Sequence, residues 1–393
     1  MERIGIYGGT FNPPHVGHLQ AAKQAITALN LNHLLVIPDR IAPHKEIPQG
    51  SPTPKQRLEM LRLAAADCPQ MEVLDIELNR EGVSYTYQTI QQLRPVYPDA
   101  ELVLFMGTDM FLSFHTWRHP EIILENASLG VFYRGEKGEE AAIEARKAAM
   151  EAMGATVYLV KNPVINISST QMRRLLAFRC AGEFLPEGVL DYIRENRLYD
   201  TRAPWKNLPM EQLEQVVIRL LNPNRVKHVL GCRDTAVKLA EHWGADVTDA
   251  ARAGILHDIT KAIDGPLQLT LCDAYGKLLS DFSKRYPKTL HALTGSLVAE
   301  RIFGENKAVV DAIESHTTGK ANMNTLEKII YLADYIEPNR TIPGVEELRR
   351  LSYTDLDAAM KLGLEMTLEH LNRQGAEVSP ESQEALAWLN SEK

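Results

Sequence analysis

Short apolar runs alternate with amphipathic stretches over the first 160 residues. Strands are predicted for the apolar runs, at residues 4–7, 34–38, 73–76, 102–106, 129–133 and 157–160. Helices are predicted between them by the spacing of apolar positions at residues 55–66, 85–93 and 139–153. Strands that alternate with helices form a parallel sheet covered on both faces. We therefore predict an α/β first half with a Rossmann-like sheet, whose ligands bind beyond the carboxyl ends of the strands.

The second half of the chain has no strand pattern. A last helix of the first half is predicted at residues 186–196, and the breaker-rich segment 201–209 has the composition of a linker. Helical spacing then recurs at residues 211–221, 225–243, 248–257, 290–303, 308–315, 326–336 and 353–372. We predict a first domain over residues 1–200 and an all-α second domain over residues 210–393.

Length, charge and cysteine usage narrow the class of protein. At 393 residues, two domains are the natural expectation. A formal charge of −8 disfavours nonspecific binding to nucleic acid or to an anionic membrane. The four cysteines lack paired spacing, and no apolar run approaches the length of a membrane span. We expect a cytoplasmic protein with neither nucleic acid nor membrane as a partner, and leave open whether it forms a homo-oligomer.

The segment GGTFNPPHVGH follows the first predicted strand. Gly8 and Gly9 would let the backbone turn sharply and approach a ligand closely. A helix that begins near residue 14 or 15 would direct its unpaired N–H groups at the mouth of the sheet, as phosphate sites require. His15 and His18 would share one face of its first turn. The segment fits neither the dinucleotide fingerprint nor the P-loop, and histidines that merely cap or pack are the alternative.

A second segment with phosphate-binding character spans residues 167–173. Ser168, Ser169 and Thr170 can cap the helix after the strand at 157–160 and offer hydroxyl and N–H groups to phosphate. Arg173 adds a cation one turn later. Taken alone, this segment would be read as an ordinary helix cap with a surface arginine.

Together the two segments resemble the signatures of the nucleotidyltransferase superfamily. Further segments, at residues 42–45, 84–86, 107–109, 117–118 and 185–199, extend the resemblance over residues 1–200 to bacterial nicotinate-mononucleotide adenylyltransferase. The resemblance implies transfer of AMP from ATP to nicotinate mononucleotide, which gives nicotinate adenine dinucleotide and pyrophosphate. A nucleotide-sensing module without turnover is the rival interpretation.

The resemblance also implies residue roles. His15, His18, Lys45 and Arg173 would act as catalytic groups that hold the triphosphate with Mg²⁺. Gly107 and Asp109 would contact the adenosine, while Ser84, Tyr85, Thr86 and Trp117 would frame the nicotinate nucleotide, although Trp117 could be core filler. The other substrate-binding residues implied are Gly8, Gly9, Thr10, Phe11, Ile167, Ser168, Ser169 and Thr170. Asn12 departs from the family, which often has Asp there, and this could alter the Mg²⁺ dependence.

In the second half, the pair His257–Asp258 ends a helical run. Alone it says little, because a His–Asp dipeptide is usually incidental. His257, Asp258, His316 and Asp334 lie in apolar or small-residue contexts, where an unpaired polar group would be costly to bury. Metal coordination would satisfy them. The full candidate ligand set is His228, His257, Asp258, His291, His316 and Asp334. Its imidazoles and carboxylates suit iron, manganese or zinc rather than a cysteine-type zinc site.

These residues resemble the ligand pattern of the HD phosphohydrolase superfamily. The segment 315–340 carries a narrower resemblance to the bacterial symmetrical diadenosine-tetraphosphate hydrolases. The resemblance implies a two-metal centre, with iron favoured, in which Asp258 is the bridging catalytic residue and Lys261 and Arg340 bind phosphate. Diadenosine tetraphosphate would be cleaved into two ADP. A dNTP or cyclic dinucleotide substrate and a regulatory metal-binding module are the alternatives, and Lys261 and Arg340 could be solvated charges.

Overall fold

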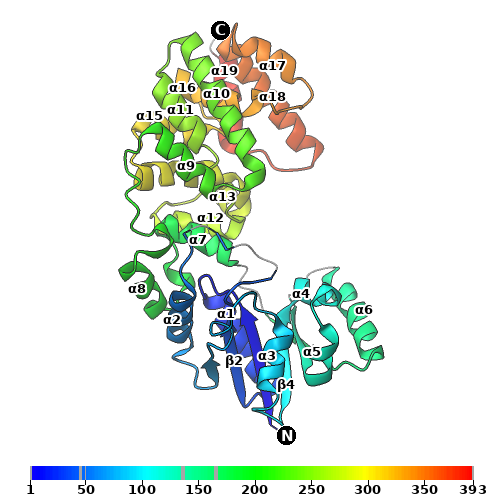
Figure 1. Ribbon diagram of the computed structural model, residues 1–393. Coiled ribbons are helices and arrows are strands. Elements are labelled where there is room, and N and C mark those ends of the chain that lie inside the picture. Colours follow the sequence, from blue (N-terminus) through cyan, green and yellow to red (C-terminus); the bar gives the residue numbers. More distant parts are fainter. Residues whose placement is uncertain (1, 44–46, 49, 134–137, 163–166, 392–393) are drawn as a thin grey trace. The chain divides into compact units, whose positions relative to one another are not determined.

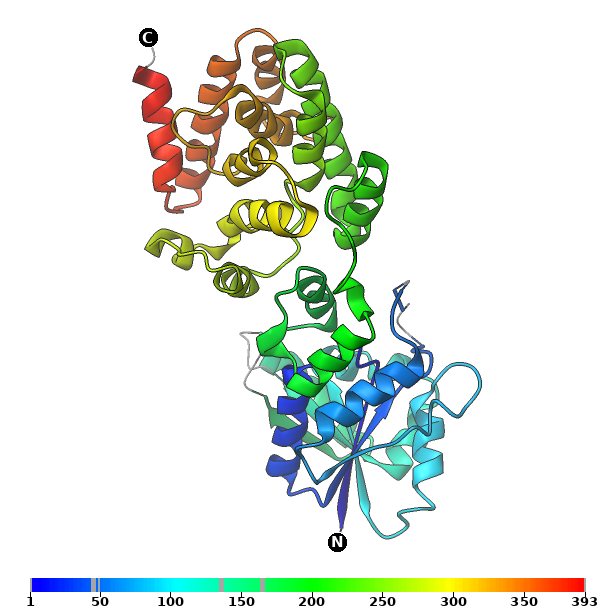
Figure 2. The same cartoon turned by 90° about the vertical axis from the view of Figure 1, so that its left-hand side faces the viewer.

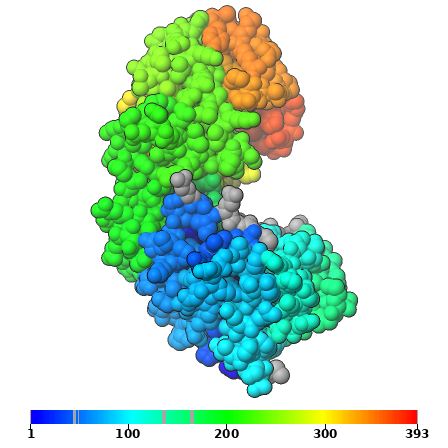
Figure 3. All heavy atoms as spheres, in the orientation of Figure 1, coloured from blue at the N-terminus to red at the C-terminus, as the bar shows by residue number. Residues whose placement is uncertain are grey.

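A six-stranded parallel sheet and a separate set of helices make up the two units of the chain, Met1–Ala203 and Pro204–Lys393 (Figure 1). The computed structural model describes residues 2–43, 47–48, 50–133, 138–162 and 167–391. Each unit is continuous in sequence, as the colours of the space-filling view show (Figure 3).

The sheet of the first unit has the strand order β3-β2-β1-β4-β5-β6, and every neighbouring pair is parallel. Its strands are β1 (Arg3–Gly9), β2 (His33–Pro38), β3 (Met71–Val73), β4 (Glu101–Gly107), β5 (Ser128–Tyr133) and β6 (Val157–Lys161). The order reverses between β1 and β4, so the chain winds outward in both directions from this pair. The predicted parallel, Rossmann-like sheet is confirmed.

Helices cover both faces of this sheet. Since successive residues of a strand point to opposite sides, each strand packs against helices on both faces. In β4, Leu102 and Leu104 pack in one buried cluster with residues of α3, α5 and α6, while Val103 and Phe105 pack in another with residues of α1 and α2. The helices of the unit are α1 (Val16–Leu29), α2 (Pro54–Ala65), α3 (Thr86–Leu93), α4 (Thr108–Leu112), α5 (Pro120–Asn126), α6 (Glu139–Ala152), α7 (Ser169–Ala177) and α8 (Glu187–Glu195). Figure 2 shows this layer of strands with its flanking helices from a second side.

Two local predictions for the first unit are wrong. The strand predicted at residues 73–76 is instead β3, at Met71–Val73. The apolar residues that follow Val73 form a loop that packs against the sheet, so the strand ends earlier than predicted. Gly8 and Gly9 do not make the turn after β1, since both lie inside the strand. The left-handed residue is Phe11, with a φ of 45°. A Cβ on Gly9 would come within 3.2 Å of the Phe11 ring, so close packing is the reason for glycine there.

The second unit contains helices and no strand among its described residues, which confirms the all-α prediction. Its helices are α9 (Met210–Leu220), α10 (Val226–Trp243), α11 (Val247–Leu256), α12 (Gly265–Ala274), α13 (Asp281–Arg285), α14 (His291–Val298), α15 (Lys307–Ser315), α16 (Thr325–Ile336), α17 (Val345–Ser352), α18 (Leu356–Arg373) and α19 (Pro380–Ser391). The single helix predicted at 290–303 is α14 followed by a π-helical turn, Ala299–Phe303. In the described chain, no helix combines the length and apolar character needed to cross a bilayer.

Candidate functional site

A cleft of about 1060 Å³ lies at the carboxyl ends of β1 and β4. In parallel α/β sheets, ligands bind where the strand order reverses, and this cleft is at that place. Its volume is sufficient for a nucleotide pair. Thirteen predicted site residues line it, namely Gly8, Gly9, Thr10, Phe11, His15, His18, Gly107, Asp109, Ile167, Ser168, Ser169, Thr170 and Arg173.

His15 and His18 stand together at the start of α1. His15 is the N-cap residue, and the two ring centroids are 3.7 Å apart. The His15 backbone N–H donates to His18 Nδ1 over 3.2 Å, which leaves the proton of neutral His18 on Nε2. Burial lowers the pKa of His15 to about 4, and its Nδ1 has no hydrogen-bond partner among the described residues. Burial therefore keeps His15 uncharged, and both rings line the wall of the cleft in fixed orientations.

The segment 167–173 meets the first segment directly. Ser168 caps α7, since its Oγ accepts from Gln171 N–H over 3.2 Å. Arg173 donates to the Asn12 carbonyl over 2.9 Å and to Thr170 Oγ1 over 3.0 Å. Two segments about 150 residues apart in the sequence thus form one wall of the cleft, and hydrogen bonds hold the Arg173 cation in place there.

Five predicted residues are not among the described residues that line this cleft. Ser84 lies beyond the end of β2, where its Oγ accepts from Arg40 N–H over 3.0 Å. Tyr85 follows it and has the Arg118 guanidinium 4.8 Å from its ring centroid. Trp117 packs against Phe114 and the apolar cluster beneath it. Thr86 is the first residue of α3. Lys45 lies outside the described residues, and the roles of all five remain predictions.

Sequence reasoning missed Arg57 of α2, whose side chain is 0% exposed. Arg57 donates to the Thr10 carbonyl over 2.6 Å and to the Asp39 carbonyl over 2.7 Å. It also pairs with the Asp39 carboxylate over 3.3 Å, and that carboxylate accepts from Thr10 Oγ1 over 2.7 Å. Arg57 therefore fixes the backbone at the start of the loop between β1 and α1, which lines the cleft. An arginine in an amphipathic helix gives no sequence signal that separates this role from a solvated one.

We expect Arg57→Met to lower the free energy of unfolding of the first unit by about 3–5 kcal/mol, because it leaves the buried Asp39 carboxylate without its partner. Urea titration followed by a probe in the first unit measures the change. Arg62→Met on the same helix removes an exposed pair with Glu59 and should change that free energy by less than about 1 kcal/mol. Equal effects of the two substitutions would contradict the role given to Arg57.

The second unit brings all six predicted metal ligands together around Asp258. His228 lies on α10, His257 and His316 cap the C-termini of α11 and α15, His291 begins α14, and Asp334 lies on α16. Asp258 Oδ2 is 3.6 Å from His228 Nε2 and 3.5 Å from His257 Nε2. Asp258 Oδ1 is 3.5 Å from His291 Nε2 and 3.8 Å from His316 Nε2. Each carboxylate oxygen thus faces its own pair of imidazoles, and Asp334 Oδ1 adds to the first pair, 3.1 Å from His228 Nε2.

The histidines are held in the orientation that binding of divalent metal ions requires. Nδ1 of His257, His291 and His316 lies 2.8, 2.9 and 2.7 Å from the carbonyl three residues earlier, so Nδ1 is the donor. Nε2 is then the nitrogen that faces Asp258, and a divalent ion would bind there in place of a proton. Although burial alone would raise the pKa of the Asp258 carboxyl, the imidazoles of His257 and His228 hold that pKa well below its usual range. The donor set therefore fits divalent cations, as an HD-type site requires.

Glu337, only 1% exposed, is a partner of the candidate ligand His228. Sequence reasoning missed it, although it lies within the segment 315–340. Its Oε1 is 3.2 Å from His228 Nδ1, while its Oε2 accepts two hydrogen bonds of 2.8 Å from Asn339. A Cβ on Gly231 would come within 2.5 Å of Oε2, so glycine is needed for this approach. Glu337 therefore gives His228 the same proton placement that backbone carbonyls give the other three histidines.

Glu337→Gln is expected to weaken metal binding to the second unit by about 10–100-fold, since a neutral amide orients and polarises His228 less well. Competition with a fluorescent chelator measures the affinity. Glu346→Gln, at a mostly exposed glutamate of α17, serves as the control and should leave the affinity unchanged. Unchanged affinity in Glu337→Gln would show that His228 needs no carboxylate partner.

Three cations border this centre. Arg340 forms an ion pair with Asp334, and Lys261 Nζ is 2.8 Å from His291 Nε2, so both predicted phosphate partners lie at the centre. Arg225, which sequence reasoning did not assign, pairs with Asp258. The three side chains come from different segments and place positive charge beside the carboxylates, as a site for a polyanion requires.

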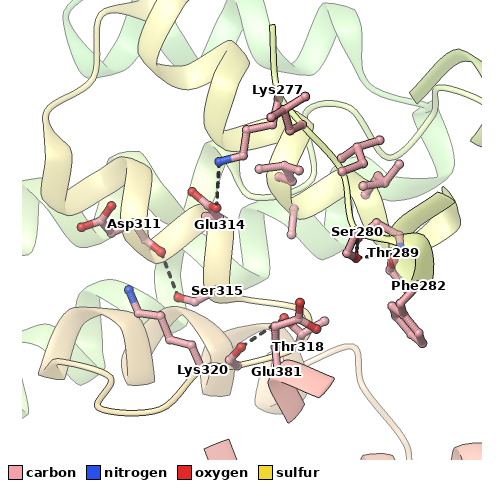
Figure 4. Close-up of a pocket in the computed structure, with 17 residues that line it drawn as sticks. Lys277, Ser280, Phe282, Thr289, Asp311, Glu314, Ser315, Thr318, Lys320 and Glu381 are labelled. Carbon is pink, nitrogen blue, oxygen red and sulfur yellow. Dashed lines mark hydrogen bonds and ion pairs between the residues drawn. The ribbon is translucent and has the colours of Figure 1, made fainter. Parts of the chain in front are cut away.

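A separate hollow of about 500 Å³ lies elsewhere in the second unit, and Figure 4 shows the side chains along it. One wall is a face of α15 and the turn after it, with Asp311, Glu314 and Thr318. Lys277 pairs with Glu314 over 3.6 Å. None of the six ligands is among the described residues that line this hollow, so it is distinct from the metal centre.

Comparison with protein families divides the chain in the same way. A family model described as Cytidylyltransferase-like matches residues 6–175, and a model described as HD domain matches residues 225–339. A relative from Dictyoglomus turgidum, named probable nicotinate-nucleotide adenylyltransferase, is 39% identical over 198 residues, which are 50% of this chain and 95% of the relative. A relative of the same name from Geobacillus thermodenitrificans is 38% identical over 204 residues, covering 52% of this chain and 88% of the relative.

Solved structures similar to each half are also known. A predicted HD superfamily hydrolase involved in NAD metabolism, from Clostridium acetobutylicum, is 37% identical with a TM-score of 0.46, covering 47% of this chain and 99% of that one. A Plasmodium falciparum nicotinic acid mononucleotide adenylyltransferase complexed with APC is 20% identical with a TM-score of 0.42, covering 51% of this chain and 99% of that one.

Proposed function

Because the chain belongs to the nicotinate-nucleotide adenylyltransferase family through its first unit and carries an HD domain in its second, we propose that it is a bifunctional enzyme. We assign adenylyl transfer to residues 1–200 and metal-dependent phosphohydrolysis to residues 210–393, joined by a linker at 201–209. The first activity is transfer of AMP from ATP to nicotinate mononucleotide. The observation that carries it is the direct contact of the two signature segments, Arg173 to Asn12, at the cleft.

Adenylyl transfer needs positioning and charge neutralisation rather than a covalent nucleophile. A phosphate oxygen of nicotinate mononucleotide attacks the α-phosphorus of ATP, and the bond from that phosphorus to the oxygen bridging to the β-phosphate breaks. Pyrophosphate leaves with that oxygen and its negative charge. In the proposal His15, His18 and Arg173 contact the phosphates, with Lys45 as a further cation. Mg²⁺ that accompanies ATP would neutralise part of the triphosphate charge.

The test of the first activity is product identification. Incubation of the full chain with ATP, nicotinate mononucleotide and Mg²⁺ should give nicotinate adenine dinucleotide and pyrophosphate in equal amounts. ATP binding without either product would favour the nucleotide-sensing alternative and would overturn the proposal.

For the second unit we propose symmetrical hydrolysis of diadenosine tetraphosphate. Two divalent ions, when bound, would supply a water of lowered pKa and neutralise phosphate charge. In the proposal, His228, His257 and Asp334 would hold one ion, His291 and His316 would hold the other, and Asp258 would be a ligand that both share. Support comes from the placement of each Asp258 oxygen opposite its own histidine pair.

The substrate of this centre is inferred from charge and from the resemblance of residues 315–340. Arg225, Lys261 and Arg340 lie beside the carboxylates, and Lys261 and Arg340 would bind phosphate oxygens. Attack of water oxygen on one of the two inner phosphorus atoms would break its bond to the central bridging oxygen. Both products are then ADP, and two protons are released to solvent.

Product analysis decides between the candidates for the second unit. The full chain, loaded with iron, manganese or zinc in turn, should convert diadenosine tetraphosphate to ADP alone. AMP together with ATP would show asymmetrical cleavage and contradict the proposal. Hydrolysis of a dNTP or cyclic dinucleotide in its place would favour the alternative phosphohydrolases, and no hydrolysis with any metal would favour a regulatory module.

A further inference from the structure

The loop between β1 and α1 is held from the far end of the first unit. Tyr199 lies in a short 3₁₀ turn, Leu198–Asp200, and its hydroxyl donates to Asn12 Oδ1 over 2.7 Å. Both side chains are buried, with exposed fractions of 7% for Tyr199 and 3% for Asn12. We propose that Tyr199 is a positioning residue for adenylyl transfer, which acts through Asn12 on the loop that binds the triphosphate. This inference rests on the function proposed for the first unit.

Asn12 joins this bond to the rest of the site. Its Nδ2 donates to Ser51 Oγ over 3.0 Å, so both ends of the amide are occupied. Its backbone carbonyl accepts from Arg173 over 2.9 Å, and His15 follows three residues later as the cap of α1. A displacement of Asn12 would therefore move two groups together. One is the carbonyl that accepts from Arg173, and the other is the start of α1, which carries His15 and His18. The amide, at the position where the family often has Asp, is engaged by Tyr199 and Ser51.

The backbone that presents Tyr199 has an uncommon conformation. Arg197, Tyr199 and Asp200 have φ values of 55°, 54° and 59°, in the left-handed region that residues with a Cβ seldom adopt. Such conformations cost about 1–3 kcal/mol each and persist where the surroundings enforce them, often at functional sites. This conformation places the Tyr199 hydroxyl beneath the loop between β1 and α1.

The hydroxyl, rather than the ring, makes the specific contact. A phenylalanine would fill the same buried space, but it would leave Asn12 Oδ1 without its donor. Burial raises the pKa of Tyr199 far above its ordinary value despite the nearby guanidinium groups of Arg173 and Arg57, so the hydroxyl remains a donor throughout the working range.

The test compares Tyr199→Phe with Tyr192→Phe in the full chain. Tyr192 is a half-buried tyrosine of α8, within the same segment 185–199, and it serves as the matched control. We expect Tyr199→Phe to weaken ATP binding, measured by calorimetry without the second substrate, and to lower kcat for adenylyl transfer, each by about tenfold. KM for nicotinate mononucleotide and hydrolysis by the second unit should stay unchanged. A purely structural role would shift the melting temperature without separating the two substrates.

A double-mutant cycle identifies the path of the effect. If Tyr199 acts through Asn12, then Asn12→Ala combined with Tyr199→Phe should have the same ATP affinity as Asn12→Ala alone. Effects that multiply would overturn the inference, and so would equal ATP affinity in Tyr199→Phe and the unsubstituted chain. Absence of nicotinate adenine dinucleotide from reactions of the unsubstituted chain would instead overturn the proposed function, because ATP binding is measured separately.

Discussion

Replacement of Asp258 by alanine is expected to remove bound metal from the second unit and to lower its hydrolysis of diadenosine tetraphosphate by at least about 10³-fold. The reason is geometric, because this one carboxylate faces both histidine pairs, His228 with His257 through Oδ2 and His291 with His316 through Oδ1. Without it the pair His291 and His316 has no carboxylate partner, and the pair His228 and His257 keeps only Asp334. Elemental analysis of the purified protein, together with measurement of ADP formation, checks both parts.

Two controls separate this effect from unfolding. Asp273→Ala, at an exposed carboxylate of α12, should leave metal content and hydrolysis unchanged. Adenylyl transfer by the first unit of the Asp258→Ala chain should also continue, since its cleft lies in a separate unit. If the Asp258→Ala chain kept its metal and its hydrolysis, the two-ion assignment would have to be abandoned.

Sequence reasoning could reach those parts of the sites that depend on local geometry. The spacing of His15 and His18 and the helix start beside them are properties of a few adjacent residues, and the structure has α1 begin at Val16. Residue type and apolar context singled out four of the six ligands, and the resemblance to the HD superfamily, rather than local geometry, implied that all six form one centre. Even the proton placement on His257 depends on a carbonyl only three residues away, Gly254, and is local in the same sense.

The contacts that sequence reasoning missed join residues far apart in the chain. Glu337 reaches His228 across 109 positions, and Tyr199 reaches Asn12 across 187. Arg57 reads as one more charge on an amphipathic helix until β1 and β2 place Thr10 and Asp39 beside it. Such pairs are set by the packing of the sheet and of the helices, and periodicity along one segment carries no information about them.

In the proposed functions the two sites would neutralise phosphate charge differently, and this decides what each would lose by substitution. In the first unit, the groups proposed to contact phosphate are two imidazoles and the guanidinium of Arg173, which the protein itself holds at the cleft. In the second unit, the carboxylates of Asp258 and Asp334 would bind anionic substrate only after cations neutralise them. Chelation is therefore expected to abolish hydrolysis even at saturating substrate, while the protein part of the transferase site stays assembled.

His18→Ala is expected to lower kcat for adenylyl transfer by about 10²–10³-fold, the range for loss of one preorganised donor to developing charge. The His15 N–H fixes Nδ1 of His18 and leaves the proton on Nε2. In the proposal, the ring donates this Nε2–H to a phosphate oxygen. As pyrophosphate departs, charge grows on its oxygens, so the loss should appear in kcat more than in KM for ATP. Pyrophosphate release measured at saturating substrates gives the value.

His33→Ala, at an exposed histidine that begins β2, is the matched control and should retain full transfer activity. His18→Gln offers a stricter comparison, because the glutamine amide can still donate a hydrogen bond, though from a less rigid side chain, and should recover part of the loss. A rise in KM for ATP with kcat unchanged would mean that His18 contributes to binding alone. Arg173 and Mg²⁺ would then have to stabilise the charge that develops during transfer without help from His18.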